Sequence, residues 1–94
     1  MSDRHRAQQR VPLGVARKGF RGHIDAIAAH AAPSGIPPAE LERRLLELGF
    51  VEGAKIEILH EGLVGRDPIA VRVNHATIAL RRREAQAVLV QTDP

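Results

Sequence analysis

The sequence has no cysteine, no tryptophan and no tyrosine, and Phe20 and Phe50 are its two phenylalanines. Without cysteine the chain can form no disulfide, no thiolate metal site and no cysteine nucleophile. Grooves that bind proline-rich peptides are lined by aromatic side chains, and barrels that bind single-stranded nucleic acid stack the bases on such side chains. The scarcity of aromatic residues therefore argues against both kinds of ligand.

Long apolar segments are absent as well. A membrane-spanning helix needs about 18 or more consecutive apolar residues, and the apolar runs here are only a few residues long. No apolar segment preceded by basic residues marks a secretory signal at the N-terminus. The 94 residues have room for one domain with one modest core. These features predict a soluble cytoplasmic protein with no direct insertion into the membrane.

Motifs that carry catalysis or hold a cofactor are also missing. The chain has no glycine-rich phosphate loop, no Gly-x-Ser-x-Gly sequence and no paired-histidine zinc motif. Its only hydroxyl side chains are Ser2, Ser34, Thr77 and Thr92, so a nucleophilic triad has almost no candidates. The sequence therefore predicts no enzyme and no cofactor.

The positive charge of the chain is concentrated at its start. The net charge is +3, and Arg4, Arg6 and Arg10 against Asp3 give the first ten residues +2 of it. Such a polar, arginine-rich start is typical of a disordered tail. We expect a tail over residues 1–10 and one nearly neutral domain over residues 11–91.

One α-helix is marked by its flanking residues. Pro38 suits the first helical turn, where its missing N–H is not needed. Leu41, Leu45 and Leu48 recur at the spacing of one buried helix face. Gly49 is a natural left-handed stop, so the helix is predicted to begin near Pro38 and to end before Gly49.

The remaining segments alternate between apolar and polar residues, as half-buried strands do. Asn74 and His75 lie between two such segments and predict a two-residue hairpin loop, because asparagine tolerates positive φ. The alanine-rich residues 26–32 are compatible with a strand running into a loop or with a short extra turn, and of these we predict a loop with little to anchor it. The fold expected is mainly β, a small barrel of about five antiparallel strands with one inserted α-helix. The strands are expected near residues 19–27, 55–58, 69–73, 77–80 and 87–90, with a single helical turn at residues 81–85.

The order of these pieces resembles the FeoA family of small proteins in bacterial ferrous iron transport. The resemblance is carried by Leu45 to Gly49 after Arg43 or Arg44, by Gly65 to Pro68, and by Ala79 to Ala85. It implies an SH3-like barrel and a role as an accessory of FeoB, a membrane transporter with a cytosolic GTPase domain. The chain departs from the family pattern at Glu52, where a proline is expected, and at Arg66, which is inserted before Asp67.

Three other functions are weighed against this one. The chain could be a regulatory domain like the SH3-like domain of iron-dependent repressors, or a module that binds or senses a transition metal. His23 and Asp25 are the metal candidates, since residues two apart share one face of a strand, but no third ligand is specified, and we expect no metal site. Arg81, Arg82 and Arg83 suggest nucleic acid, but we interpret them as a solvated turn.

A surface for a protein partner must then be aliphatic. Leu46 lies off the buried face of the predicted helix, and Ile36 precedes that helix in a proline-rich loop. We expect Ile36 and Leu46 to form the apolar centre of a contact surface, with Arg43 and Arg44 as its polar rim.

Overall fold

A computed structural model of the chain describes residues 10–93. The strands are β1 (Val11–Pro12), β2 (Arg21–Ile27), β3 (Lys55–Val64), β4 (Asp67–Val73), β5 (Ala76–Leu80) and β6 (Val88–Thr92). The helices are α2 (Pro38–Glu47) and α3 (Arg82–Ala85), and two short 3-10 turns are η1 (Leu13–Val15) and η2 (Ala29–Ala31). The expected tail lies outside the described residues except for Arg10, whose Nε lies 2.9 Å from Oδ2 of Asp25.

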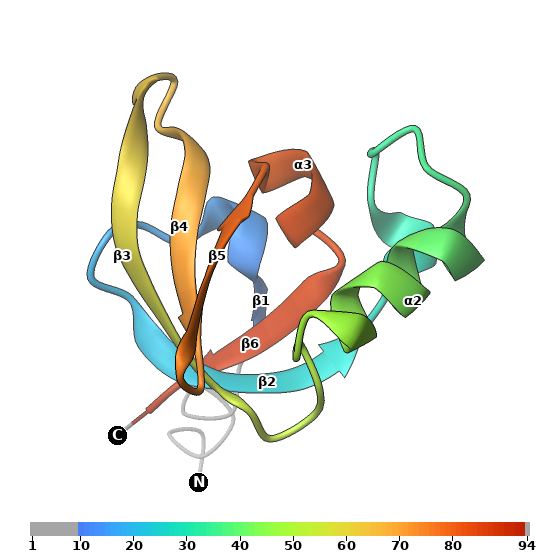
Figure 1. The fold of residues 1–94 in the computed structure, drawn as a ribbon, viewed down its shortest axis with the longest axis horizontal. Helices are drawn as coiled ribbons and strands as arrows, with labels where there is room; N and C mark the ends of the chain where they lie inside the picture. The colour runs from blue at the N-terminus through green and yellow to red at the C-terminus, as the bar shows by residue number, and fades with distance from the viewer. Residues whose placement is uncertain (1–9, 94) are drawn as a thin grey trace, which may run out of the picture.

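The strands form one antiparallel sheet in the order β1-β6-β2-β3-β4-β5. This sheet curls on itself into a small barrel, with α2 at one side and the β3–β4 hairpin rising at the other (Figure 1). The predicted mainly β barrel with one inserted helix is confirmed. The two-residue strand β1 is an addition to the strands expected from the sequence.

A single apolar core fills the barrel. Each of the five longer strands contributes to it, for example through Ile24, Ile58, Val71, Leu80 and Val90, none of which is more than 6% exposed. Since these side chains come from every side of the curled sheet, the sheet needs no second layer to bury its inner face.

The end of α2 corrects one prediction about the core. Leu48 was expected to complete the buried stripe with Leu41 and Leu45, but it is 42% exposed. The helix stops one residue earlier, and Gly49 takes a φ of 101°. The N–H of Phe50 then donates to the carbonyl of Leu45 at 2.9 Å, as in a Schellman motif. Phe50, which is fully buried, takes the place in the core that Leu48 was predicted to fill.

The alanine-rich segment is also more structured than predicted. Strand β2 continues to Ile27, and η2 follows where a poorly anchored loop was expected. The N–H of Ala28 donates to the carbonyl of Ala87 at 2.7 Å, and Ala29 is buried. A small side chain can be buried where little room is left, so alanine here serves close packing against α2.

Two tight turns connect β3 to β4 and β4 to β5. Asn74 and His75 link β4 to β5 as predicted, and Asn74 has a φ of 54°. Gly65 and Arg66 link β3 to β4, with φ of 66° and 58°. Positive φ at both central residues is typical of a type I′ hairpin turn.

Truncation of Leu45 to alanine tests this core. Leu45 is 1% exposed, and we expect Leu45→Ala to lower the free energy of unfolding by about 2–5 kcal/mol through lost transfer energy and a cavity. Leu46→Ala is the matched control, because the neighbouring leucine is 43% exposed and a surface change costs about 0.5 kcal/mol or less. Urea unfolding measures both, and equal losses would show that α2 is rotated from the orientation described.

Candidate functional site

The four residues suggested as a contact surface lie on α2 and in the loop before it. Arg43 and Leu46 are exposed, and so is Arg44, whose Nη2 donates to Oε2 of Glu40 at 3.3 Å. Ile36 is half-buried and packs against the core. With a rotation of about 100° per residue, Arg44 and Leu46 point roughly 160° apart around the helix. The structure therefore distributes the suggested residues over two faces of α2.

A groove of about 180 Å³ runs along the Arg44 side of the helix. It is bounded by α2, β5 and α3, and its lining residues are Leu41, Arg44, Leu45, Leu48, Ala79, Leu80 and Glu84. The lining is apolar apart from Arg44 and Glu84, which carry opposite charges. Sequence reasoning missed this groove because it assigned Leu48 to the core, whereas the exposed Leu48 side chain forms part of its wall.

The most connected polar group lies at the start of α3. The guanidinium of Arg82 donates from Nε to the carbonyl of Arg66 at 2.7 Å, and from Nη1 to the carbonyls of Gly14 at 3.1 Å and Ala16 at 2.6 Å. Its Nη2 lies 2.8 Å from Oε2 of Glu61. The side chain is only 17% exposed, so the interpretation of residues 81–83 as a solvated turn is wrong for Arg82. The sequence carries no signal for this role, because most of the acceptors are backbone carbonyls far along the chain.

Glu61 is the acidic centre of this network. Burial alone would raise the pKa of Glu61, but the backbone N–H of Lys18 and the charges of Arg17 and Arg82, with Arg66, hold this pKa below its ordinary value. The Lys18 N–H donates to Oε2 at 3.1 Å, and Nε of Arg17 lies 3.5 Å from the same oxygen. The carboxylate therefore joins the chain after η1 to β3 and α3.

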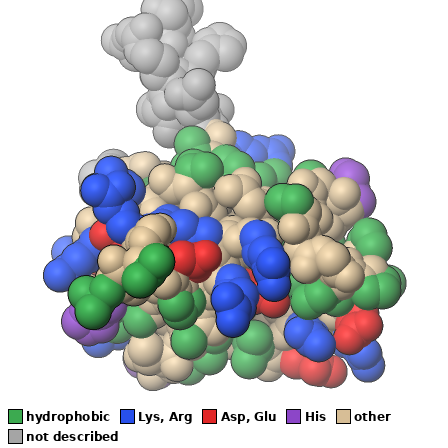
Figure 2. All heavy atoms as spheres, turned by 90° about the horizontal axis from the view of Figure 1, so that it is seen from above, with side chains coloured by type: hydrophobic (Ala, Val, Ile, Leu, Met, Phe, Trp, Pro, Cys, Tyr) green, Lys and Arg blue, Asp and Glu red, His purple; other side chains and the backbone are tan. Residues whose placement is uncertain are grey.

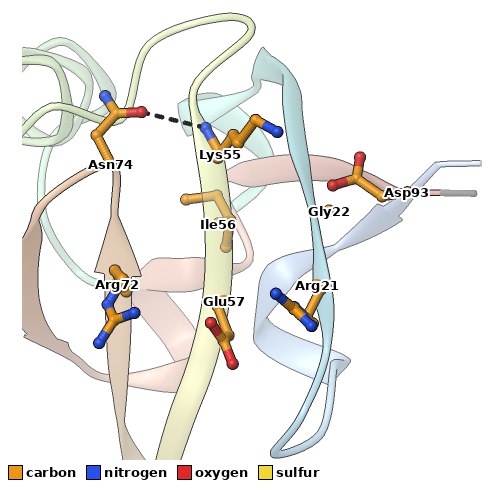
Figure 3. Close-up of a pocket in the computed structure, with 8 residues that line it drawn as sticks. All are labelled: Arg21, Gly22, Lys55, Ile56, Glu57, Arg72, Asn74 and Asp93. Carbon is orange, nitrogen blue, oxygen red and sulfur yellow. Dashed lines mark hydrogen bonds between the residues drawn. The ribbon is translucent and has the colours of Figure 1, made fainter.

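A second groove, of about 190 Å³, lies on the outer face of the sheet. Its lining residues are Arg21, Gly22, Lys55, Ile56, Glu57, Arg72, Asn74 and Asp93. Figure 3 shows Glu57 of β3 between Arg72 of β4 and Arg21 of β2, as the strand register requires. Acidic and basic side chains are interleaved here, so the charges of Glu57 and Asp93 oppose an anion that the three cations would attract.

The two residues suggested as metal candidates pair with different partners. His23 Nδ1 lies 3.0 Å from Oδ1 of Asp93, whereas Asp25 pairs with Arg10. The register of β2 against β6 shifts between Ile24 and Ala26, and such a bulge changes the direction of the side chains around it. Among residues 10–93, no group of three or more His, Asp or Glu side chains could hold a metal ion.

Comparison of this chain with known proteins shows which family it belongs to. The model of the FeoA domain family matches residues 11–92. The solution structure of FeoA from Chlorobium tepidum is 32% identical, with a TM-score of 0.71 over 89% of this chain and 71% of that one. The crystal structure of Stenotrophomonas maltophilia FeoA, a procaryotic SH3 domain protein solved with zinc, is 30% identical, with a TM-score of 0.66 over 84% of this chain and 87% of that one. No curated protein matches the chain.

The likeness to IdeR concerns the fold and nothing more. The crystal structure of IdeR from T. acidophilum is 19% identical, with a TM-score of 0.67 over 89% of this chain and 34% of that one. Together with the S. maltophilia protein, this likeness confirms the SH3-like architecture expected from the sequence. In the part of the chain described, no helix is both long and apolar enough to cross a membrane.

Acidification tests the Glu61 network. The folded-state pKa of Glu61 is lowered, so its stabilising contribution is complete above the ordinary pKa of 4.5 and is lost as the pH falls through the folded-state value. We expect Glu61→Gln to be less stable than the wild type at neutral pH, and the difference to shrink as the pH falls below 4.5. Urea unfolding from pH 7 downward measures it, with Glu52→Gln in an exposed turn as control. A difference that is independent of pH would contradict the role given to this carboxylate.

Calorimetry under anaerobic conditions tests metal binding. Because His23 and Asp25 have separate partners, we expect titration with ferrous iron at micromolar concentration to give no saturable heat. The same titration with His23→Ala is the comparison. A stoichiometric event that disappears in this variant would assign the histidine to a metal site.

Proposed function

The chain belongs to the FeoA domain family, and we propose that it acts in ferrous iron transport by contact with the membrane transporter of that system, FeoB. The family is linked to ferrous iron transport. The step proposed for this chain is the contact itself, made with the cytosolic part of the transporter. Such a role is that of a non-catalytic accessory on the cytosolic side of the membrane.

The observation that supports a contact role is the apolar surface around α2. Leu46, Leu48 and Val51 are each exposed to between 42% and 43%, although each is large and apolar. Leu46 and Leu48 lie on different faces at the end of α2, so exposed apolar surface, which is typical of interaction sites, extends around this end of the helix. The groove beside α2 is concave and mostly apolar, so a side chain of a partner could fill it. Side chains buried in such pockets provide most of the energy of an interface.

The polar residues of α2 suit the rim of this surface. Arg43 and Arg44 are exposed on α2, about 100° apart around the helix, and Glu42 and Glu47 are exposed as well. Charges at a rim guide encounter and orientation more than they add to affinity. We therefore place Leu46 at the centre of the proposed contact, with Arg43 beside it and Arg44 at the edge of the groove. Ile36 lies in the loop before the other end of α2, where it is half-buried and packs against the core.

Substitution of Leu46 tests this contact. We expect Leu46→Asn to weaken co-purification with the cytosolic part of FeoB by roughly tenfold or more, because loss of an interface anchor costs about 1–2 kcal/mol or more. The melting temperature should stay nearly unchanged, because the side chain is 43% exposed. Ile36→Asn is not equivalent, since a half-buried residue that packs on the core would also lose stability.

Two further variants locate the surface. Leu63→Asn is the matched control, the same chemical change at a fully exposed leucine on the β3–β4 hairpin, and it should leave co-purification with the cytosolic part intact. Leu48→Asn probes the groove side of α2. Full binding by both α2 variants would contradict a contact through this helix.

A further inference from the structure

The tip of the β3–β4 hairpin is the most exposed apolar part of residues 10–93. Leu63 is 103% exposed and Val64 is 86% exposed, values well above those of the leucines on α2. Both lie at the end of β3, directly before the turn at Gly65 and Arg66. The hairpin rises at the upper left of Figure 1, on the side of the barrel away from α2. Neither side chain contributes to the core or to the surface proposed above.

The backbone of the hairpin is built to present Leu63. The register of β3 against β4 shifts between Glu61 and Val64, so Gly62 and Leu63 form a bulge. A Cβ at position 62 would lie 2.1 Å from the backbone oxygen of Asp67. Only glycine permits this close approach, and the bulge that it permits turns the next side chain outward.

One cation lies in the turn at the apolar tip, and others lie at the base of the hairpin. Arg66 is exposed in the turn itself, in a left-handed conformation that glycine or asparagine would adopt at lower cost. The 2.7 Å hydrogen bond from Nε of Arg82 to its carbonyl helps to hold it there. Arg17 and Lys18 are exposed at the base of the hairpin, where Nε of Arg17 and the backbone N–H of Lys18 approach the carboxylate of Glu61. Two carboxylates lie here, Glu61, which is shared between Arg17 and Arg82, and Asp67, which accepts from the backbone N–H of Arg82 at 2.9 Å. Against the four cations Arg17, Lys18, Arg66 and Arg82 they leave this end of the molecule with a net charge of +2.

We propose that this tip, formed by Leu63, Val64 and Arg66 with Arg17 and Lys18 behind it, docks on an anionic membrane surface. An apolar pair at the front and cations behind it match the two layers of such a surface, the acyl boundary and the charged headgroups. Arginine suits the boundary because its stem can lie along apolar groups while its charge reaches the phosphates. Figure 2 looks onto this end of the molecule from above and shows hydrophobic side chains next to Lys and Arg, with Asp and Glu side chains among them.

The docking is peripheral and shallow. The sequence predicted no insertion into a membrane, and two exposed side chains on a hairpin enter no further than the headgroup boundary. Their apolar area is small, so the affinity depends on the charges as well and should fall steeply with salt, since the Debye length shrinks from about 30 Å at 0.01 M to about 8 Å at 0.15 M. The docking is independent of the proposed contact through α2.

Co-sedimentation of the full chain with lipid vesicles tests the proposal. The vesicles contain three parts of phosphatidylcholine to one part of phosphatidylserine, and vesicles of phosphatidylcholine alone are the comparison. We expect binding to the anionic vesicles at low salt and much weaker binding to the neutral ones. Leu63→Asn should weaken the binding about tenfold, and Arg66→Asn about fivefold. Asparagine tolerates the left-handed conformation, so Arg66→Asn removes the charge without disturbing the turn. Leu46→Asn on α2 is the matched control and should bind as the wild type does.

Fluorescence gives a second, independent readout. The chain has no tryptophan or tyrosine, so Leu63→Trp introduces a single reporter at the tip. Its emission should shift to the blue on anionic vesicles, and that of Leu46→Trp should not. Vesicle binding that the Leu63 and Arg66 variants leave unchanged would be carried by another basic part of the chain and would overturn the proposal. The proposal also fails if Leu63→Asn leaves vesicle binding intact but abolishes co-purification with a protein partner.

Discussion

The guanidinium of Arg82 joins parts of the chain that are far apart in sequence, and the shape of one whole end of the barrel depends on it. Its four hydrogen bonds reach Gly14, Ala16, Glu61 and Arg66. Buried carbonyl groups without a donor are costly, so removal of this side chain would leave several acceptors unsatisfied at once. The approach of η1 to α3 is itself close, because a Cβ at Gly14 would lie 2.4 Å from the carbonyl oxygen of Arg82. A glycine and an arginine together thus close the end of the barrel that carries the β3–β4 hairpin.

The opposite side of the barrel is held by apolar packing. Leu41 and Leu45 of α2 are buried, and Phe50 enters the core directly after the helix ends. The hydrogen bond from Phe50 to Leu45 ends α2 and directs the chain into the turn before β3. The early end leaves Leu48 half exposed beside the groove. The same local geometry therefore completes the core and creates the apolar surface on which the proposed contact depends.

Local patterns in the sequence predicted the elements well, and they failed where distant residues decide. The helix, its glycine stop and the Asn74–His75 turn each depend on neighbours in sequence, and the structure confirms all three. The exposure of Leu48 depends on whether Leu48 or Phe50 reaches the core, which helical periodicity cannot distinguish. The role of Arg82 depends on carbonyls more than sixty residues away. The exposure of Leu63 at the hairpin tip results from a bulge opposite Pro68, which is a property of strand pairing and not of periodicity along one strand.

The two proposed surfaces have a geometric consequence when they are considered together. The hairpin tip and α2 lie on different sides of the barrel (Figure 1), so one chain could rest on a membrane through the tip while α2 faces a partner held at the same membrane. Each contact rests on only a few anchoring side chains, and each would be weak alone. Binding at one surface raises the effective concentration of the chain at the other, and linked contacts of this kind can gain about 10²–10⁴ in apparent affinity without any new interaction. A transporter embedded in an anionic membrane presents both surfaces at once. The rigid barrel between the tip and α2 would then fix the orientation in which the chain meets its partner.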